Sequence, residues 1–174
     1  MSLLRPSTSG LALVIASVWV GFPVASLAQQ TTPEAIELAE VFWPGSVTLV
    51  LSDPGALYPE GVRGPQGSVA VRMSPHPLVQ KLVGGMGGPI LSTSANSPGE
   101  PPALDARGAL GAALAVGAGE ELWVLDGGVL KPSPPSTLID CSGPEPVVLR
   151  QGTIPLGSLR CVLPGVRAGV TNDE

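Results

Sequence analysis

Glycine and proline divide this chain into short apolar runs, and that division limits the folds it can form. The 174 residues include 23 glycines and 20 prolines, about a quarter of the chain, a share at which disorder has to be considered. Disordered chains are short of core-forming residues and rich in charge, whereas this chain is 44% hydrophobic and 13% charged. We therefore predict one folded domain with many tight loops, since the length suits a single domain.

The apolar runs predict strands interleaved with helices. Helices are expected at 31–43, 75–87 and 104–115, the first because Thr32 can cap it and Pro33 suits the first helical position. The runs that predict strands are 11–18, 46–52, 67–73, 89–94, 121–128, 136–142 and 146–152. This alternation favours an α/β fold with a twisted mixed sheet. We expect the domain to cover residues 1–163 and a loose tail to cover 164–174.

The first 30 residues have two interpretations. Arg5 stands ahead of an apolar stretch that closes on small residues, which resembles a secretory leader. The alternative, which Pro23 inside that stretch favours, is a buried strand at 11–18. Gly21 and Pro23 interrupt the only long apolar run, so we expect no transmembrane helix.

Charge, histidine and cysteine content argue against several kinds of site. A net charge of −5 argues against a protein that grips nucleic acid directly. His76 is the only histidine, which excludes a site with several histidine ligands. Cys141 and Cys161 form no CxxC pair, so we expect reduced structural thiols and no zinc site.

Polar residues recur where the predicted strands begin or end. Arg72 ends "VAVR", Ser94 and Asn96 end "LSTSAN", Ser136 opens "STLID" and Arg150 closes "VVLR". Strand ends gather at one edge of a sheet, so these side chains are expected to converge. Arginine forks with hydroxyl and amide donors suit a carboxylate or a phosphate, which predicts an anion or nucleotide site. Surface arginines and Asx turns remain the structural alternative.

Other polar and aromatic residues favour structural roles. His76 lies between two prolines and is expected at a helix start, and Asp126 precedes two glycines and is expected in a turn. Asp140 is expected to pair with a neighbour, the alternative being magnesium. Phe42 and Trp43 are expected in the core.

Six motifs together make the chain similar to a known family. They are "FWPGSVTLVL", "VAVRMSPHPL", "GGPILSTSAN", "DGG", "STLID" and "LRQGTI". Their order and approximate spacing resemble the YrdC-type family of threonylcarbamoyl-adenylate synthases over about residues 4–155. The resemblance implies a YrdC-like twisted α/β fold with a concave, anion-binding face.

The resemblance also implies an activity. The family joins L-threonine, bicarbonate and ATP into threonylcarbamoyl-AMP and releases pyrophosphate, which makes its members nucleotidyltransferases. A partner transferase then passes the threonylcarbamoyl group to an adenosine of tRNA, so tRNA is met only indirectly. Magnesium is expected with the ATP, and the expected location is the cytoplasm, away from membranes.

The motifs carry site residues onto this chain. By resemblance, L-threonine is bound by Arg72, Ser92 and Ser136. The ATP-binding positions that the resemblance implies are Arg5, Ser9, Ser68, Ser94, Asn96 and Arg150. It implies no catalytic side chain and no metal ligand from the protein.

The chain departs from the family's pattern near its start. The opening strand and its "PT-x-T-x-Y-G-L" motif are absent, and Leu3 stands where the next motif has lysine. The resemblance is thus to an N-terminally shortened member that lacks the usual first strand. Two hypotheses follow: an active synthase, or a truncated, non-catalytic member that binds a nucleotide or a partner protein. A related module of hydrogenase maturation is disfavoured because its zinc-binding cysteines are absent.

Overall fold

The computed structural model describes residues 15–16, 31–97, 99–118 and 122–169. The chain forms two compact units, which are described separately below. The sheet unit comprises Ala12–Ser92 and Pro134–Glu174, and the smaller unit comprises Met1–Leu11 and Thr93–Ser133. The prediction of one domain over residues 1–163 stays a prediction.

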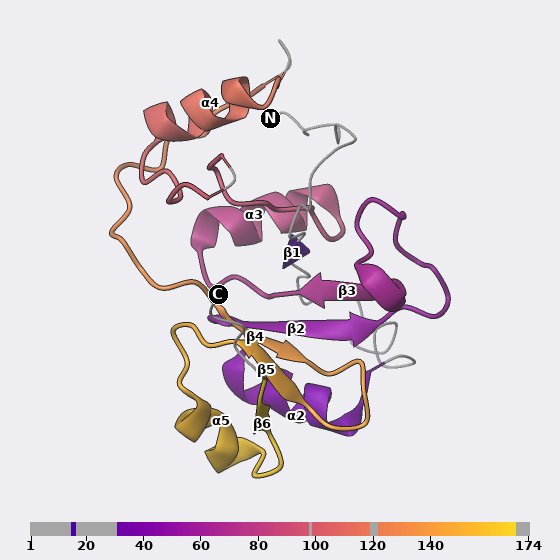
Figure 1. Ribbon diagram of the computed structural model, residues 1–174. Helices are drawn as coiled ribbons and strands as arrows, with labels where there is room; N and C mark the ends of the chain where they lie inside the picture. The colour runs from indigo at the N-terminus through magenta and orange to yellow at the C-terminus, as the bar shows by residue number, and fades with distance from the viewer. Residues whose placement is uncertain (1–14, 17–30, 98, 119–121, 170–174) are drawn as a thin grey trace. The chain divides into compact units, whose positions relative to one another are not determined.

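The sheet unit contains a mixed sheet of six strands in the order β1-β3-β2-β4-β5-β6 (Figure 1). Neighbours pair parallel at β1–β3, β2–β4 and β5–β6, and antiparallel at β2–β3 and β4–β5. The strands are β1 (Ile15–Ala16), β2 (Val47–Ser52), β3 (Ser68–Val71), β4 (Thr137–Asp140), β5 (Val147–Arg150) and β6 (Arg167–Ala168). The predicted α/β class with a mixed sheet is confirmed.

Helices α2 (Pro33–Phe42) and α5 (Leu156–Val162) pack on one face of this sheet. Thr32 caps α2 by accepting a hydrogen bond from the amide of Ala35 at 3.2 Å, as its position before Pro33 predicted. Along β2 the core residues Val47, Leu49 and Leu51 alternate with Thr48, Val50 and Ser52, which point to the other face. The largest fully buried apolar side chains are Leu38, Leu49, Ile139, Leu159, Val47, Val71 and Val166.

Helix α3 (Pro77–Met86) follows β3 in the sheet unit. The Nδ1 atom of His76 accepts a hydrogen bond from the amide of Leu78 at 3.3 Å, so this histidine caps the helix. The helix ends at Gly87, whose φ of 69° is the left-handed conformation that glycine adopts without steric cost. The structural interpretation of His76 is therefore confirmed.

The smaller unit contains helix α4 (Ala106–Ala115), capped by Asp105, whose Oδ1 accepts from the amide of Gly108 at 2.7 Å. Within the described part of this unit, no residue lies in a strand, so the strand predicted at 121–128 is wrong for 122–128. The strand predicted at 89–94 is also wrong, since only Ile90 makes an isolated bridge. The apolar residues of the segment 122–128 are exposed instead: Trp123 is 68% and Leu125 63% exposed.

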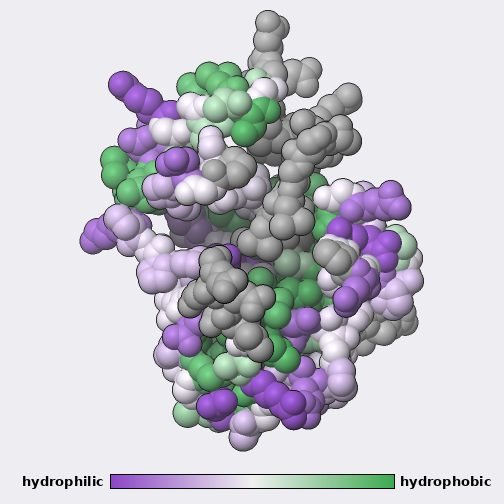
Figure 2. All heavy atoms as spheres, viewed as in Figure 1, coloured by the Kyte–Doolittle hydropathy of each residue, from purple (hydrophilic) through white to green (hydrophobic). Residues whose placement is uncertain are grey.

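Apolar side chains are also exposed on α4 itself, where Figure 2 shows green surface. Leu114 is 57% exposed and Val116, just after the helix, is 58% exposed. None of the residues of α4 is buried. The apolar share of the sequence therefore overstates the amount of core in this unit.

Two elements near the C-terminus were not predicted. Helix α5 follows Pro155, and strand β6 adds to the sheet edge beside β5. Val166 is 1% exposed, so the looseness expected for 164–174 is wrong for the residues through 169. Residues 170–174 lie outside the described part of the chain.

The expected strand at 11–18 is confirmed at Ile15–Ala16, which pair with Ala70 and Val71. Its other residues, and the expected leader or strand around them, lie outside the described ranges. Within those ranges no helix is both long enough and apolar enough to span a bilayer.

Candidate functional site

Arg72 lies directly after β3, at the end of the sheet where β2 begins. Its Nε donates a hydrogen bond to the carbonyl oxygen of Gly45 at 2.8 Å, and the amide of Gly45 donates to the carbonyl of Met73 at 2.9 Å. A side chain at Gly45 would collide with the carbonyl oxygen of Phe42, so only glycine fits. Partial burial lowers the pKa of Arg72 from its ordinary value. The guanidinium is thus held at a defined place on the sheet end.

Ser136 immediately precedes β4 at the same end of the sheet. Its Oγ lies 2.7 Å from the Oγ1 of Thr48 on β2, and the two residues are 4% and 1% exposed. The strands run parallel here, with Val47 opposite Thr137, which brings the start of β2 beside the start of β4. The result is a pair of buried hydroxyl groups in hydrogen-bond contact.

Arg150 ends β5, and a register shift decides which face it occupies. Ile139 pairs with Val148, but Leu138 pairs with Arg150, so one extra residue is inserted in β5. Without this bulge Leu149 would stand opposite Leu138, and Arg150 would fall on the face that carries Val148. The bulge therefore turns Arg150 to the side of the sheet that carries Leu138.

The contacts of Arg150 leave part of its guanidinium unused. Its Nη2 donates to the carbonyl oxygen of Ser136 at 3.1 Å. Its Nε is buried and has no hydrogen-bond partner among the residues that the structure describes. A buried donor without a partner costs free energy, and an anionic ligand would relieve that cost.

The segment after Arg150 is tied to the start of β4 through Thr137. The Oγ1 of this fully buried residue accepts from the amides of Gly152 at 3.1 Å and Ile154 at 3.0 Å, and donates to the carbonyl of Ile154 at 2.7 Å. A Cβ at Gly152 would lie 2.6 Å from the carbonyl carbon of Ser136. The close backbone approach at Gly152 explains the glycine of "LRQGTI".

Of the residues expected to converge, Arg72, Ser136 and Arg150 gather at one end of the sheet, whereas Ser94 and Asn96 follow no strand of it. Successive side chains of a strand point to opposite faces of the sheet. Arg72 follows the core residue Val71, so its side chain points to the other face, the one that carries Thr48. Two guanidinium groups and two buried hydroxyls on one face form an arrangement that suits a carboxylate or phosphate.

The structure places Ser68 elsewhere. It starts β3 and pairs with Ser52, at the other end of the sheet from Arg72. Four residues of extended chain correspond to about 13 Å. Ser68 is thus separated from the arginine that follows the same strand.

The serines and asparagine of "LSTSAN" lie in an exposed loop. Ser92 and Ser94 are exposed, Ser92 at the end of the first segment of the sheet unit and Ser94 in the smaller unit. Asn96 closes a turn, because its Nδ2 donates to the carbonyl oxygens of Ser97 at 3.1 Å and Glu100 at 2.7 Å. Its Oδ1 is buried and has no hydrogen-bond partner in the described part of the chain. Arg5 and Ser9 lie outside the described residues.

The structural interpretations of two aspartates are confirmed. The Oδ1 of Asp126 accepts from the amide of Gly128 at 2.9 Å, which closes a turn. The Oδ1 of Asp140 accepts from the amide of Ser142 at 2.9 Å and from its hydroxyl at 2.6 Å. No three acidic, histidine or cysteine residues in the described ranges cluster as metal ligands would.

The cysteines and the two aromatic residues at the end of α2 also have structural environments. Both cysteines are free, Cys141 buried and Cys161 exposed. Phe42 and Trp43 pack against the core while partly exposed, and the indole nitrogen of Trp43 donates to the carbonyl of Val47 at 2.8 Å. These residues support the sheet end without adding a charged group to it.

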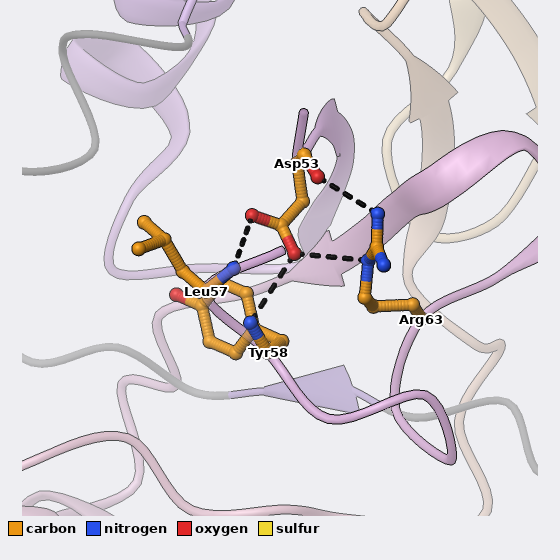
Figure 3. A network of polar contacts seen from close by, with 4 residues as sticks. All are labelled: Asp53, Leu57, Tyr58 and Arg63. Carbon is orange, nitrogen blue, oxygen red and sulfur yellow. Dashed lines mark hydrogen bonds and ion pairs between the residues drawn. The ribbon is translucent and has the colours of Figure 1, made fainter. Parts of the chain in front are cut away.

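Sequence reasoning missed a buried acidic network at the other end of β2 (Figure 3). Asp53 is fully buried, and its Oδ2 lies 3.1 Å from the Nε of Arg63. Its carboxylate also accepts from the amides of Leu57 at 2.9 Å and Tyr58 at 3.2 Å. Burial, and secondarily the charge of Asp53, raises the pKa of Tyr58. The "SDPG" turn was the available signal, and the network fixes the loop that leads into β3.

Comparison with known proteins identifies a family. The Sua5_yciO_yrdC family, described as "Telomere recombination", matches residues 3–152. The threonylcarbamoyl-AMP synthase of Pyrococcus abyssi is 34% identical over 163 residues, covering 94% of this chain and 46% of that protein. The threonylcarbamoyl-AMP synthase of Bacillus subtilis is 33% identical over 160 residues, covering 91% and 44%.

Solved structures agree with the family assignment. The crystal structure of P. abyssi Sua5 complexed with L-threonine matches with a TM-score of 0.75 and 30% identity, covering 91% of this chain and 45% of that one. Escherichia coli YciO matches with a TM-score of 0.64 and 20% identity, covering 91% and 86%, which supports the fold alone. The chain spans about half the length of the curated relatives it matches.

Proposed function

The chain belongs to the Sua5/YciO/YrdC family, and from this premise we propose that it forms threonylcarbamoyl-AMP and pyrophosphate from L-threonine, bicarbonate and ATP. Relatives that carry the name threonylcarbamoyl-AMP synthase support the reaction class, a transferase reaction. One relative was crystallised with L-threonine, which supports that substrate. The product would serve threonylcarbamoyladenosine modification of tRNA in the cytoplasm.

The observation that carries the proposal is the gathering of Arg72, Ser136 and Arg150 at one end of the sheet. Arg150 holds a buried Nε without a partner, and Arg72 has terminal nitrogens beyond its contact with Gly45. ATP is an anion and L-threonine carries a carboxylate, so two fixed arginines can orient the substrates and offset the charge of these groups. We assign Arg72 and Ser136 to L-threonine and Arg150 to the nucleotide.

The remaining assignments follow the family motifs. Ser92 is proposed on the threonine side, and Ser94, Asn96 and Ser68 on the ATP side, together with Arg5 and Ser9. The unpartnered Oδ1 of Asn96 supports a ligand contact there. Ser68 has the weakest support, because it lies at the opposite end of β3 from Arg72.

Magnesium is proposed to arrive with ATP. The described residues offer no acidic cluster for a bound cation, and Asp140 is occupied by Ser142. Mg²⁺ commonly binds through substrate phosphates with few protein ligands. The protein's own part is then to hold the substrates, and transfer to tRNA is left to a partner transferase.

Pyrophosphate release tests this proposal. The purified 174-residue chain is incubated with ATP and magnesium, with and without L-threonine and bicarbonate. Release that requires both L-threonine and bicarbonate supports the synthase. Binding of ATP or L-threonine by a folded chain without release would overturn it in favour of the non-catalytic alternative.

A further inference from the structure

Thr48 belongs to none of the positions assigned by the family motifs, yet its side chain contacts one of them directly. Its Oγ1 lies 2.7 Å from the Oγ of Ser136. Thr48 is 1% and Ser136 4% exposed, and Thr48 lies opposite Leu138, two residues further from the end of the sheet than Ser136. Any effect of this hydroxyl on a ligand must pass through Ser136.

The two hydroxyl groups of Thr48 and Ser136 carry one hydrogen more than their mutual hydrogen bond uses. Each hydroxyl carries one hydrogen and can accept up to two hydrogen bonds. In a pair of hydroxyls one hydrogen therefore forms the bond between them, and the other remains available as a donor. Neither Oγ1 of Thr48 nor Oγ of Ser136 has another hydrogen-bond partner among the described residues. The remaining hydrogen is therefore a donor without an acceptor among the described residues, in a place where unused buried donors are costly.

The surroundings decide which hydroxyl keeps its hydrogen free. Thr48 stands in the interior of β2, opposite Leu138 of β4, whereas Ser136 precedes β4 at the sheet end. The carbonyl oxygen of Ser136 also holds Arg150, so the backbone of this residue is fixed next to a cation. A ligand at the sheet end can reach the hydroxyl of Ser136 more readily than that of Thr48.

We propose that Thr48 is a positioning residue whose hydroxyl donates to the Oγ of Ser136 and thereby directs the Ser136 hydroxyl outward as a donor to the carboxylate of L-threonine. This inference rests on the proposed function, because it takes L-threonine as the ligand at Ser136. A valine at position 48 would keep the shape and remove the donor. The Ser136 hydroxyl would then turn freely or bond elsewhere.

Binding of L-threonine by calorimetry tests the inference without requiring turnover. Thr48→Val is expected to weaken binding about tenfold, since one oriented hydrogen bond to a charged group is lost. Thr48→Ser keeps the donor and is expected to bind as the unaltered chain does. In a Ser136→Ala background, Thr48→Val should have no further effect, because coupled residues are not additive.

Ser52 provides the matched control. It lies on the same face of β2 four residues away, and its hydroxyl donates to the carbonyl oxygen of Ser142 at 3.2 Å. Ser52→Ala also removes a partly buried hydroxyl from this strand, but at the far end of the sheet. It should leave L-threonine binding unchanged, and thermal melting of all variants shows whether each is folded.

Three results would overturn the inference. Unaltered L-threonine binding by Thr48→Val would show that Ser136 needs no positioning. If Thr48→Val weakened binding equally with serine and with alanine at position 136, Thr48 would act through another residue. If Thr48→Ser weakened L-threonine binding as much as Thr48→Val, the effect would come from the packing of the threonine methyl group and not from its hydroxyl. If the unaltered chain binds no L-threonine, the proposed function fails as well, and this outcome differs from the other three.

Discussion

The Nε of Arg72 and the carbonyl oxygen of Gly45 form a 2.8 Å hydrogen bond that fixes one edge of the guanidinium. Arg72 makes no other hydrogen bond or ion pair to the described residues. Its two terminal nitrogens therefore remain for a ligand, in the fork that matches a carboxylate. The carbonyl of Gly45 thus occupies the Nε of Arg72 and leaves its two terminal nitrogens available to a ligand.

Replacing Arg72 by lysine tests the importance of the fork. Arg72→Lys keeps the charge but loses both the contact to Gly45 and the second donor. We expect the KM for L-threonine in pyrophosphate release to rise about tenfold or more, corresponding to about 1.4 kcal/mol. Arg72→Ala should abolish threonine-dependent release while the chain stays folded. Unchanged turnover in Arg72→Ala would remove Arg72 from the site.

Two glycines allow a matched test of backbone packing near Ser136. A Cβ at Gly152 would lie 2.7 Å from the carbonyl oxygen of Ser136, whereas one at Gly157 in α5 meets nothing within 4 Å. We expect Gly152→Ala to lower the free energy of unfolding by about 2 kcal/mol or more. Gly157→Ala should raise it by about 0.5 to 1 kcal/mol, because alanine favours the helix. Urea denaturation measures both, and equal effects would contradict the packing argument.

The sequence predicts most of the sheet unit because its strands and helices carry local signals. The strand predictions at 46–52, 67–73, 136–142 and 146–152 all contain strands of the structure. The predictions at 89–94 and 121–128 failed although they show similar apolar runs. A strand also needs a partner to pair with, and an apolar run does not reveal whether one is present.

The candidate site was predictable in outline only. Positions at strand ends placed Arg72, Ser136 and Arg150 together, but the bulge that turns Arg150 to the proper face has no local signature. Thr48 was missed because a threonine inside an apolar strand resembles an ordinary strand residue. Its meaning depends on Ser136, which lies 88 residues away in the sequence.

The buried pair of Asp53 and Arg63 gives a stability prediction independent of ligand. Asp53→Ala removes the carboxylate that holds Arg63 and the amides of Leu57 and Tyr58. Breaking a buried ion pair from one side costs about 3 kcal/mol, so a clear fall in the unfolding free energy is expected. Denaturation of Glu145→Gln is the control.

The control pair lies on the surface. Glu145 and Arg167 are 2.7 Å apart, but their side chains are 53% and 66% exposed. Exposed pairs contribute little, so Glu145→Gln should change stability by less than about 0.5 kcal/mol. A loss for Asp53→Ala no greater than that of Glu145→Gln would show that the loop from Asp53 to Gly67 is held by other contacts.

The two thiols should differ sharply in reactivity. Burial, followed by the charges of Asp140 and Glu34, raises the pKa of Cys141 from 9.0 to about 12, whereas Cys161 is exposed. Only the thiolate reacts with iodoacetamide, so at about pH 8 the folded chain should take one label, at Cys161. Because the folded state disfavours the thiolate of Cys141, this group favours folding below pH 9 and loses that contribution as pH rises toward 12. Mass spectrometry counts the labels before and after unfolding in urea, with Cys161→Ser as the control that should take none while folded. A label on Cys141 in the folded chain at that pH would mean that this part of the core opens to solvent.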